Sequence, residues 1–263
     1  MLAKYNMEKL YSKFTPIIAE CNQGQKKVGV KYGGYVLYQN IFSSMKKPVI
    51  IVKNHIFNKN PGYKKFNTIC ETIKYPLVLG GDHSVGTSTV LSSVEKYKDK
   101  LTVIWIDAHG DINTFSASKT KNRHGMPLAM CVGLDKYWWR TKEKKNLSYD
   151  NLIYVGVREL DDFEKKIIKE HNIKVYTPQK AVNYIKNTKN KIHISFDVDG
   201  LDPKFMNSTG TIASNGLKDN DVRKIIGVAL DMNRLVGLDV VEFNPELGDM
   251  EMSLNSLKKI FRV

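Results

Sequence analysis

Acidic and imidazole side chains gather at one point of this 263-residue chain, directly after an apolar run at residues 101–106. The run predicts a buried parallel strand. Asp107, His109 and Asp111 then stand two residues apart, so an extended backbone that continued past the strand would turn all three side chains to one side. Two carboxylates and an imidazole that converge at a strand end are typical of a metal site.

Two other strand ends carry the same kinds of side chain. Asp197 and Asp199 lie at the end of the apolar run at residues 192–198, and His83 follows the run at residues 75–79. In an open parallel sheet, ligands collect at the carboxyl ends of the strands. Each aspartate taken singly could instead cap a helix, and a lone histidine could be structural. Their placement at three strand ends favours one shared site.

The six candidate metal ligands are His83, Asp107, His109, Asp111, Asp197 and Asp199. Their four carboxylates carry a formal charge of −4, which two divalent cations balance. Two metal ions about 3.5–4 Å apart could share bridging carboxylates and a water that loses a proton near neutral pH. A set of mostly oxygen ligands with two imidazoles and no thiolate favours Mn²⁺ over a structural Zn²⁺.

Eight apolar runs predict the strands that position these residues. They lie at residues 14–21, 48–52, 75–79, 101–108, 152–157, 173–176, 192–198 and 235–243. Helical patterns alternate with them, at residues 35–44, 64–74, 84–98, 128–134, 161–171, 219–233 and 253–261. Asp219 or Asn220 is the expected cap of one helix, and Trp138 and Trp139 are expected in a loop. The alternation predicts an α/β fold, with a mainly parallel eight-stranded sheet between two helical layers, in a single domain of residues 1–263.

Charge and cysteine content bear on partners and compartment. The formal net charge is +14, but the lysines are scattered without a compact basic stripe, which favours a solvated surface over a nucleic-acid interface. Cys21, Cys70 and Cys131 show no CxxC spacing and indicate a reducing compartment. No apolar signal core or membrane-length run is present in the sequence. We expect a cytoplasmic protein that binds neither nucleic acid nor membranes.

Five motifs stand in a fixed order along nearly the whole chain: Gly-Gly-Asp-His-Ser, Asp-Ala-His-Gly-Asp-Ile-Asn, His-Gly-Met-Pro, Ser-Phe-Asp-Val-Asp-Gly-Leu-Asp-Pro and Val-Glu-Phe-Asn-Pro. In this combination they resemble the ureohydrolase family, and arginase most closely. The resemblance implies a three-layer αβα fold and a binuclear manganese centre that hydrolyses a guanidinium group to urea. It also implies a homo-oligomer, a trimer or a hexamer.

The resemblance further implies roles for single residues. One Mn²⁺ would be held by His83, Asp107, Asp111 and Asp197, and the other by Asp107, His109, Asp197 and Asp199. The catalytic residues would be Asp111, the proton shuttle His124, and Glu242, which pairs with the substrate guanidinium. The contacts to the amino-acid end of arginine would be Asn113, Thr120 and Asp161. Thr120 stands where most arginases carry serine, so it keeps the hydroxyl and adds a methyl group.

The chemistry of guanidinium hydrolysis agrees with these roles. A guanidinium is a poor electrophile, so the attack needs a hydroxide held in place. The leaving amine must gain a proton, and a histidine such as His124 with a pKa near neutrality suits that task. A buried cation needs a carboxylate partner, which Glu242 can supply. Each residue also has a structural alternative: His124 could be a loop histidine that caps a helix, and Glu242 could be a surface acid.

The favoured hypothesis is conversion of L-arginine and water to L-ornithine and urea, by attack of a metal-bridging hydroxide on the guanidinium carbon. The nearest alternative is agmatinase or another ureohydrolase with a guanidino substrate, although Asn113 and Asp161 favour an α-amino acid. An inactive metal-binding homologue would be marked by a lost ligand or a lost His124, and none is lost. A nucleic-acid binder would show a strongly salt-dependent affinity.

Overall fold

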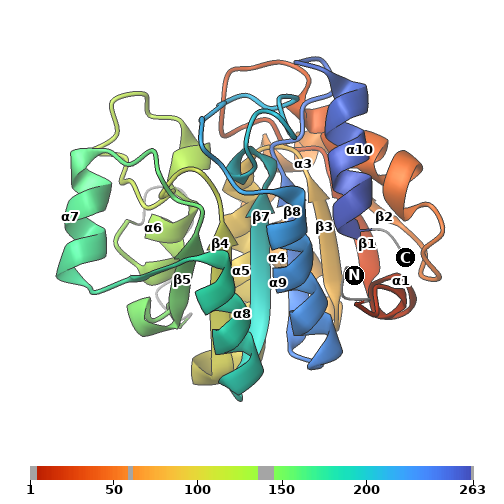
Figure 1. Cartoon of the computed structure of the whole chain (residues 1–263). Helices are drawn as coiled ribbons and strands as arrows, with labels where there is room; N and C mark the ends of the chain where they lie inside the picture. Colours follow the sequence, from red (N-terminus) through yellow and green to blue (C-terminus); the bar gives the residue numbers. More distant parts are fainter. Residues whose placement is uncertain (1–4, 59–61, 136–144, 262–263) are drawn as a thin grey trace.

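An eight-stranded sheet runs through the centre of the protein in the computed structural model, which describes residues 5–58, 62–135 and 145–261 (Figure 1). The strands are β1 (Thr15–Ala19), β2 (Ile50–Val52), β3 (Pro76–Gly80), β4 (Leu101–Ile106), β5 (Leu152–Val155), β6 (Lys174–Tyr176), β7 (Lys191–Asp197) and β8 (Leu235–Val241). Their order across the sheet is β2-β1-β3-β8-β7-β4-β5-β6. All seven neighbouring pairs are parallel, where the sequence predicted a mainly parallel sheet.

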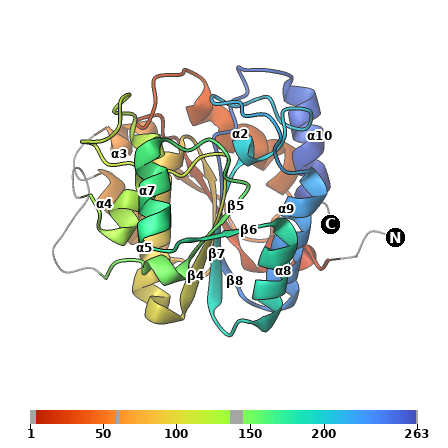
Figure 2. The ribbon, with the colours of Figure 1, turned by 60° about the vertical axis from the view of Figure 1, so that its left-hand side comes forward.

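Helices cover both faces of the sheet and give the molecule three layers (Figure 2). One layer contains α2 (Gly33–Leu37), α8 (Pro178–Asn187), α9 (Asp219–Asp231) and α10 (Met250–Phe261). The other layer contains α3 (Asn54–Phe57), α4 (Gly62–Thr72), α5 (Gly86–Tyr97), α6 (Pro127–Val132) and α7 (Asp162–Glu170). The short helix α1 (Glu8–Lys13) packs with the first layer. The predicted αβα arrangement is confirmed.

The central strand β4 shows why both faces need helices. All six of its residues are buried. Alternate residues face opposite layers, so that Ile104 and Ile106 join one apolar cluster while Val103 and Trp105 join the other. A strand buried on both faces reads as a continuous apolar run, which is the pattern that made it recognisable in the sequence.

Some elements differ from the sequence predictions. Helix α8 is absent from those predictions, although Thr177 caps it and Pro178 stands in its first turn, where proline is tolerated. The N-cap of α9 is Lys218, so the expectation of Asp219 or Asn220 as the cap is wrong. The side chain of Lys218 makes no capping hydrogen bond.

The predicted helix at residues 35–44 changes its winding part-way. It consists of α2 followed by a five-residue π-helical stretch, Tyr38–Phe42. Trp138 and Trp139 lie outside the described residues.

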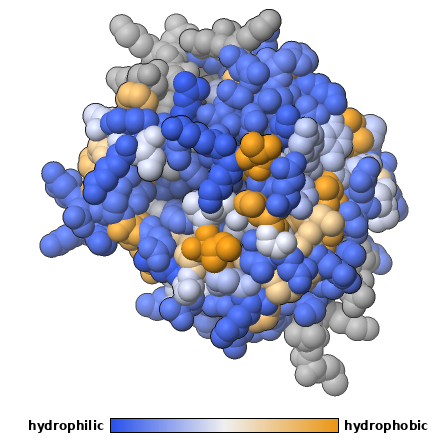
Figure 3. All heavy atoms as spheres, turned by 90° about the horizontal axis from the view of Figure 1, so that it is seen from above, coloured by the Kyte–Doolittle hydropathy of each residue, from blue (hydrophilic) through white to orange (hydrophobic). Residues whose placement is uncertain are grey.

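The carboxyl ends of all the strands meet at one edge of the sheet, which is the upper edge in Figure 1. Seen from above, this face is mostly hydrophilic with scattered apolar residues (Figure 3). The candidate metal ligands lie at the end of the central strand β7 and in the segments that directly follow β3, β4 and β7. Among the described residues, no helix combines the length and the apolar character that a bilayer span requires.

Candidate metal centre

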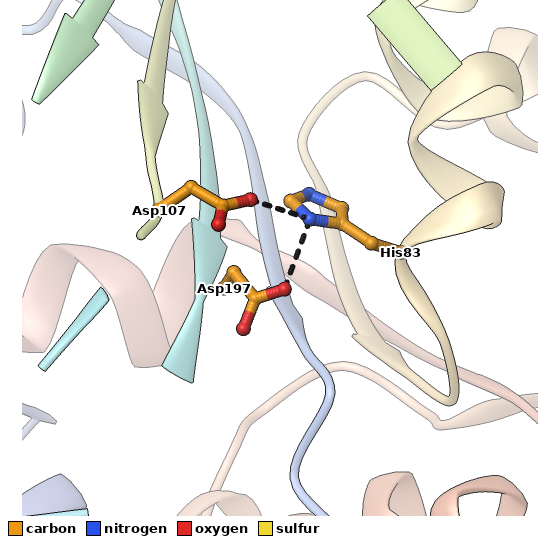
Figure 4. A group of neighbouring side chains, drawn as sticks. All are labelled: His83, Asp107 and Asp197. Atoms are coloured by element: carbon orange, nitrogen blue, oxygen red, sulfur yellow. Dashed lines mark hydrogen bonds and ion pairs between the residues drawn. The ribbon is translucent and has the colours of Figure 1, made fainter. Parts of the chain in front are cut away.

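Three carboxylates surround the ring of His83, which follows β3 in a short 3-10 turn. Its Nδ1 lies 3.0 Å from Asp107 Oδ2, 3.0 Å from Asp111 Oδ2 and 3.1 Å from Asp197 Oδ2. Asp107 directly follows β4 and Asp197 ends β7, and these two strands pair with each other. Figure 4 shows the His83 ring directed at the carboxylates of Asp107 and Asp197.

A second group of similar composition shares Asp107 with the first. His109 Nδ1 lies 3.4 Å from Asp107 Oδ1 and 3.1 Å from Asp199 Oδ2, so the Asp107 carboxylate turns one oxygen toward each histidine. Asp197 Oδ1 accepts a hydrogen bond of 2.8 Å from the backbone amide of Asp199, while its Oδ2 faces His83. Within each group, one potential ligand atom per residue lies within 4.8 Å of the others.

Asp111 reaches the centre through a tight backbone turn. The expectation of an extended chain from Asp107 to Asp111 is wrong, because β4 ends before Asp107 and Asp111 has a φ of 51°. This left-handed conformation is costly for a residue other than glycine and is found where the surrounding structure enforces it. Here the Tyr154 hydroxyl donates a 2.6 Å hydrogen bond to the carbonyl of Gly110 and fixes the turn.

Burial and neighbouring charges shift the pKa values of the acids of the centre in different directions. Burial, followed by the charges of Asp199 and Asp107, raises the pKa of Asp197 well above its usual value. Burial and the charge of Asp107 raise the pKa of Asp111 to about 7. Burial opposes the ionisation of Asp107 as well, but hydrogen bonds to the two histidines outweigh it and lower the pKa.

The donor atoms of the six side chains suit divalent cations. Acids this close resist joint ionisation unless positive charge lies between them, and a bound divalent cation supplies it. Burial lowers the pKa of His109, but its hydrogen bonds to Asp107 and Asp199 raise the pKa to about 12; in the absence of metal this imidazolium supplies part of the positive charge. Oxygen-rich sets with imidazole and no thiolate are compatible with Mn²⁺.

A cavity of about 160 Å³ opens over the centre. Among the candidate ligands, its lining includes His109, Asp111, Asp197 and Asp199. Five further lining residues were not predicted from the sequence, namely Ser118, Asn122, Gly125, Glu164 and Thr211. Ser118 and Asn122 lie in a polar loop without periodicity, so no pattern marked them. Glu164 stands one helical turn after Asp161, and that spacing was an available signal.

His124 lines the cavity and is joined to Glu242. Its Nδ1 lies 3.1 Å from Glu242 Oε1, which also accepts a 2.8 Å hydrogen bond from the backbone amide of His83. Burial lowers the pKa of His124, but the hydrogen bond to Glu242 and nearby carboxylates raise it to about 9. Glu242 itself is 1% exposed and lies outside the cavity lining. Its second oxygen accepts a hydrogen bond from the side-chain amide of Gln25.

A glycine loop fixes the backbone of His124. The Gly24 amide donates a 2.9 Å hydrogen bond to Asp82 Oδ2, and the Gly24 carbonyl accepts one of 3.1 Å from the His124 amide. A Cβ atom at Gly24 would lie 2.3 Å from Asp82 Oδ1 and 2.8 Å from the His124 amide nitrogen. Only glycine fits this close approach.

The three residues expected at the amino-acid end of the substrate lie on one side of the centre. Asn113 and Thr120 line the cavity, and the Asn113 side-chain amide donates a hydrogen bond to Asp161 Oδ2. Asp161 is exposed, lies outside the lining and is the N-cap of α7. Its Oδ1 accepts a 2.9 Å hydrogen bond from the Glu164 amide, and Glu164 Oε2 accepts one of 3.2 Å in return. Asp161 therefore reaches the cavity through Asn113.

Arg158 holds the loop that follows β7 through hydrogen bonds to its backbone. No sequence pattern indicated this role. Its guanidinium donates hydrogen bonds to the carbonyl groups of Gly156, Asp199, Gly200, Leu201, Ala213 and Ser214. Both ends of the loop are thereby tied to the segment after β5, and the backbone that carries Asp199 is held in place.

The sequence matches the arginase family over residues 48–262, which include all six candidate ligands. The chain belongs to the arginase family. The resemblance that the five motifs carry is thus confirmed, and the His and Asp groups are candidate sites for the binuclear metal centre of this family of ureohydrolases.

Two similar arginases come from Plasmodium. That of Plasmodium berghei is 35% identical over 237 residues, which cover 77% of this chain and 67% of the relative. That of Plasmodium falciparum is 34% identical over 249 residues, which cover 86% of this chain and 57% of the relative. The chain therefore spans between 57% and 67% of the lengths of these two arginases.

A solved arginase structure extends the similarity to the fold. The Entamoeba histolytica arginase, crystallised in complex with L-ornithine, superposes with a TM-score of 0.83 at 26% sequence identity. The match covers 96% of this chain and 98% of that arginase. The three-layer architecture around the centre is thus the architecture of an arginase.

Glu164 makes the stability of the metal-free protein depend on pH in a specific way. Burial and the charge of Asp111 raise its pKa to about 8. Between about pH 4.5 and about pH 8 the folded state holds this proton while the unfolded chain has released it, so stability falls as pH rises. Glu164→Gln should remove a slope of at most about 1.4 kcal/mol per pH unit.

Urea unfolding of chelator-treated protein across this pH range measures the effect of Glu164→Gln. Glu170→Gln is the matched control, since Glu170 lies on the same helix and is exposed. Parallel pH profiles for wild type and Glu164→Gln would show that Glu164 is ionised in the folded protein.

Proposed function

We propose that this protein hydrolyses L-arginine to L-ornithine and urea with two Mn²⁺ ions per subunit. The observation that carries the proposal is the cavity over two adjoining His and Asp groups, with His124 in its wall. The sequence relatives named arginase and the solved arginase with L-ornithine support this choice of substrate. The proposed ligands are the six residues His83, Asp107, His109, Asp111, Asp197 and Asp199.

In this proposal, the polar side chains around the cavity each have a role in the reaction. When bound, a pair of Mn²⁺ ions supplies Lewis acidity that brings the pKa of water into the neutral range. Asp111, which lines the cavity, would be one of the residues that hold the metal ions. Glu242 holds the His124 ring through Nδ1 and supplies negative charge for the substrate guanidinium. His124, with a pKa raised to about 9, donates a proton to the leaving nitrogen of ornithine.

The far end of the cavity would recognise the α-amino acid. Thr120 and the Asn113 amide offer hydrogen-bond donors to the substrate carboxylate. Asp161, aligned by Asn113, offers negative charge to the α-ammonium group. Agmatine lacks the carboxylate, so a site built for arginine leaves these groups unpaired when agmatine binds.

Agmatinase activity is the alternative function. Asp161 lies outside the cavity lining and one of its oxygens caps α7, and this observation favours a less demanding recognition of the amino-acid end. The two functions predict opposite substrate preferences.

Urea release with arginine and agmatine side by side, at saturating Mn²⁺, tests the proposal. We expect arginine to be preferred by at least about 10²-fold in kcat/KM. Asp161→Asn is the informative variant, because asparagine caps a helix as well as aspartate does, while it loses the charge and the oxygen that accepts from Asn113. It should erode the preference by weakening arginine alone. Equal or better turnover of agmatine by wild type would replace arginase with agmatinase as the function.

Assembly and location complete the proposal. We propose that residues 1–263 act as a single domain in a cytoplasmic homo-oligomer, a trimer or a hexamer, without nucleic-acid or membrane partners. Cys21, Cys70 and Cys131 are all buried free thiols, which supports a reducing compartment. Light scattering of the purified protein measures the mass of the assembly, and a monomer at micromolar concentration would contradict the oligomer.

A further inference from the structure

Glu242 is covered by its neighbours, although its proposed role requires contact with the substrate. It is 1% exposed and lies outside the cavity lining. Its Oε1 is already occupied, because the His83 amide donates a 2.8 Å hydrogen bond to it and His124 Nδ1 lies 3.1 Å away. Only Oε2 remains for a guanidinium group, and the side-chain amide of Gln25 donates to this oxygen. A carboxylate oxygen accepts about two hydrogen bonds, so Gln25 takes one of the two acceptor positions that are left.

Gln25 also lies close to the wall of the cavity. A Cβ atom at Gly210 would lie 3.3 Å from Gln25 Oε1 and 3.7 Å from Gln25 Nε2, so the side-chain amide packs against this glycine. Gly210 directly precedes Thr211, which lines the cavity. The amide of Gln25 is therefore in contact with Glu242 on one side and with the loop after β7 on the other. It covers the oxygen of Glu242 that a guanidinium group needs.

The backbone around Gln25 is anchored, whereas its side chain is able to turn. Gly24 is held by the two hydrogen bonds described above, and the Val28 carbonyl accepts a 2.7 Å hydrogen bond from the side-chain amide of Asn244. The Gln25 side chain is partly exposed. Exposed side chains change rotamer in picoseconds to nanoseconds. The Gln25 amide can therefore leave Glu242 without any movement of the loop.

The charge of the substrate favours such an exchange. The Gln25 amide is a neutral donor, whereas a guanidinium group is a cation with a planar fork of N–H donors. Hydrogen bonds between a cation and a carboxylate are roughly twice as strong as neutral ones. A guanidinium group that reaches Glu242 Oε2 can thus replace the amide. Until then the amide keeps this buried carboxylate oxygen hydrogen-bonded, which avoids the cost of an unpaired buried charge.

We propose that Gln25 is a gate residue over Glu242, whose side-chain amide caps Oε2 until the guanidinium group of the substrate replaces it. The inference rests on the proposed function for the role of Glu242 as the guanidinium partner. A competing contact lowers the apparent affinity for a ligand by the fraction of protein in which that contact is broken. One neutral hydrogen bond is strong enough to change the affinity by about 2–10-fold.

Two substitutions of Gln25 should change the KM for arginine in opposite directions. Gln25→Met keeps the length of the side chain and loses the donor, so the KM should fall by about 2–10-fold. Gln25→Lys replaces the neutral donor with a cation that binds Glu242 more tightly, so the KM should rise by about 10-fold. Both effects should be larger in KM than in kcat, because the gate competes with binding. A residue that only supported the fold would weaken binding in both variants.

Calorimetric titration of the Mn²⁺-loaded protein with guanidinium ion tests the gate without turnover. Gln25→Met should tighten guanidinium binding and Gln25→Lys should weaken it, by the same factors as for KM. Glu242→Gln identifies the site, since the binding that this variant loses is binding at Glu242. The matched controls are Gln23→Met and Gln23→Lys, because Gln23 lies on the same loop and its side-chain amide donates a 2.9 Å hydrogen bond to Asn22 instead. Both controls should keep the wild-type affinity for guanidinium.

Weaker guanidinium binding by Gln25→Met than by wild type would overturn the gate, because it would show that the amide supports Glu242 for binding. Equal affinities of wild type, Gln25→Met and Gln25→Lys would also overturn it. Wild-type protein that releases no urea, but whose guanidinium affinity changes in opposite directions in the two Gln25 variants, would overturn the proposed function alone.

Discussion

Asp197→Asn is expected to remove tight Mn²⁺ binding and leave the metal-free fold intact. Asparagine has the shape of a protonated aspartate, and the pKa of Asp197 is raised well above its usual value by burial and by the charges of Asp199 and Asp107. The substitution therefore relieves repulsion in the metal-free protein. It also removes the negative charge that faces His83. Partners that only orient ligands contribute up to about 10²-fold to metal affinity, and the loss of a ligand should lower Mn²⁺ affinity by more than that.

Elemental analysis, Mn²⁺ isotherms and urea unfolding in chelator separate the two effects of Asp197→Asn. The expected result is loss of metal and of urea release, with metal-free stability equal to or above that of wild type. Asp150→Asn is the matched control, because Asp150 is exposed and lies outside the centre. Full urea release by metal-stripped wild type, or an unchanged metal content in Asp197→Asn, would contradict the metal-dependent mechanism.

The strands and the convergence of the candidate ligands at one edge of the sheet could be predicted because both have strong local signals. A strand buried on two faces is a continuous apolar run, as in β4, and the acids at its end interrupt the run abruptly. Parallel strands then bring such ends to one edge without any further information. Helix α8 lacked a comparable signal. Only Ala181, Val182 and Ile185 of its ten residues are buried, so its short apolar stripe was hidden among polar residues.

The backbone that aims the ligands could not be predicted, because it depends on contacts between distant residues. Asp111 and Glu242 both have a positive φ, at 51° and 63°. The turn at Asp111 depends on Tyr154 of another strand, and the Glu242 amide donates a 2.9 Å hydrogen bond to the carbonyl of Gly81 after β3. Such conformations persist only where the assembled fold enforces them, and a linear pattern does not reveal that.

The dual position of Asp161 was also hidden in the sequence. Its place before an acidic first turn indicated a helix start, and the structure shows a full capping box with Glu164. Asp161 also accepts a hydrogen bond from Asn113. This contact depends on the position of the loop after β4, which the sequence does not reveal. Capping and contact with the cavity are therefore combined in one carboxylate, which is why a variant that keeps the cap, Asp161→Asn, is needed to separate them.

His124→Asn is expected to keep both metal ions and lose most of the turnover. Asparagine can retain a hydrogen bond to Glu242, and the backbone bond between residue 124 and Gly24 is unaffected. What it cannot do is give up a proton to the leaving amine, and a positioned acid or base contributes about 10²–10⁴-fold to kcat. The KM for arginine should change little, since no substrate-binding group is removed.

His55→Asn is the matched control, because His55 is exposed on α3. Loss of Mn²⁺ from His124→Asn would make His124 a ligand, and a wild-type kcat would remove it from the proton pathway.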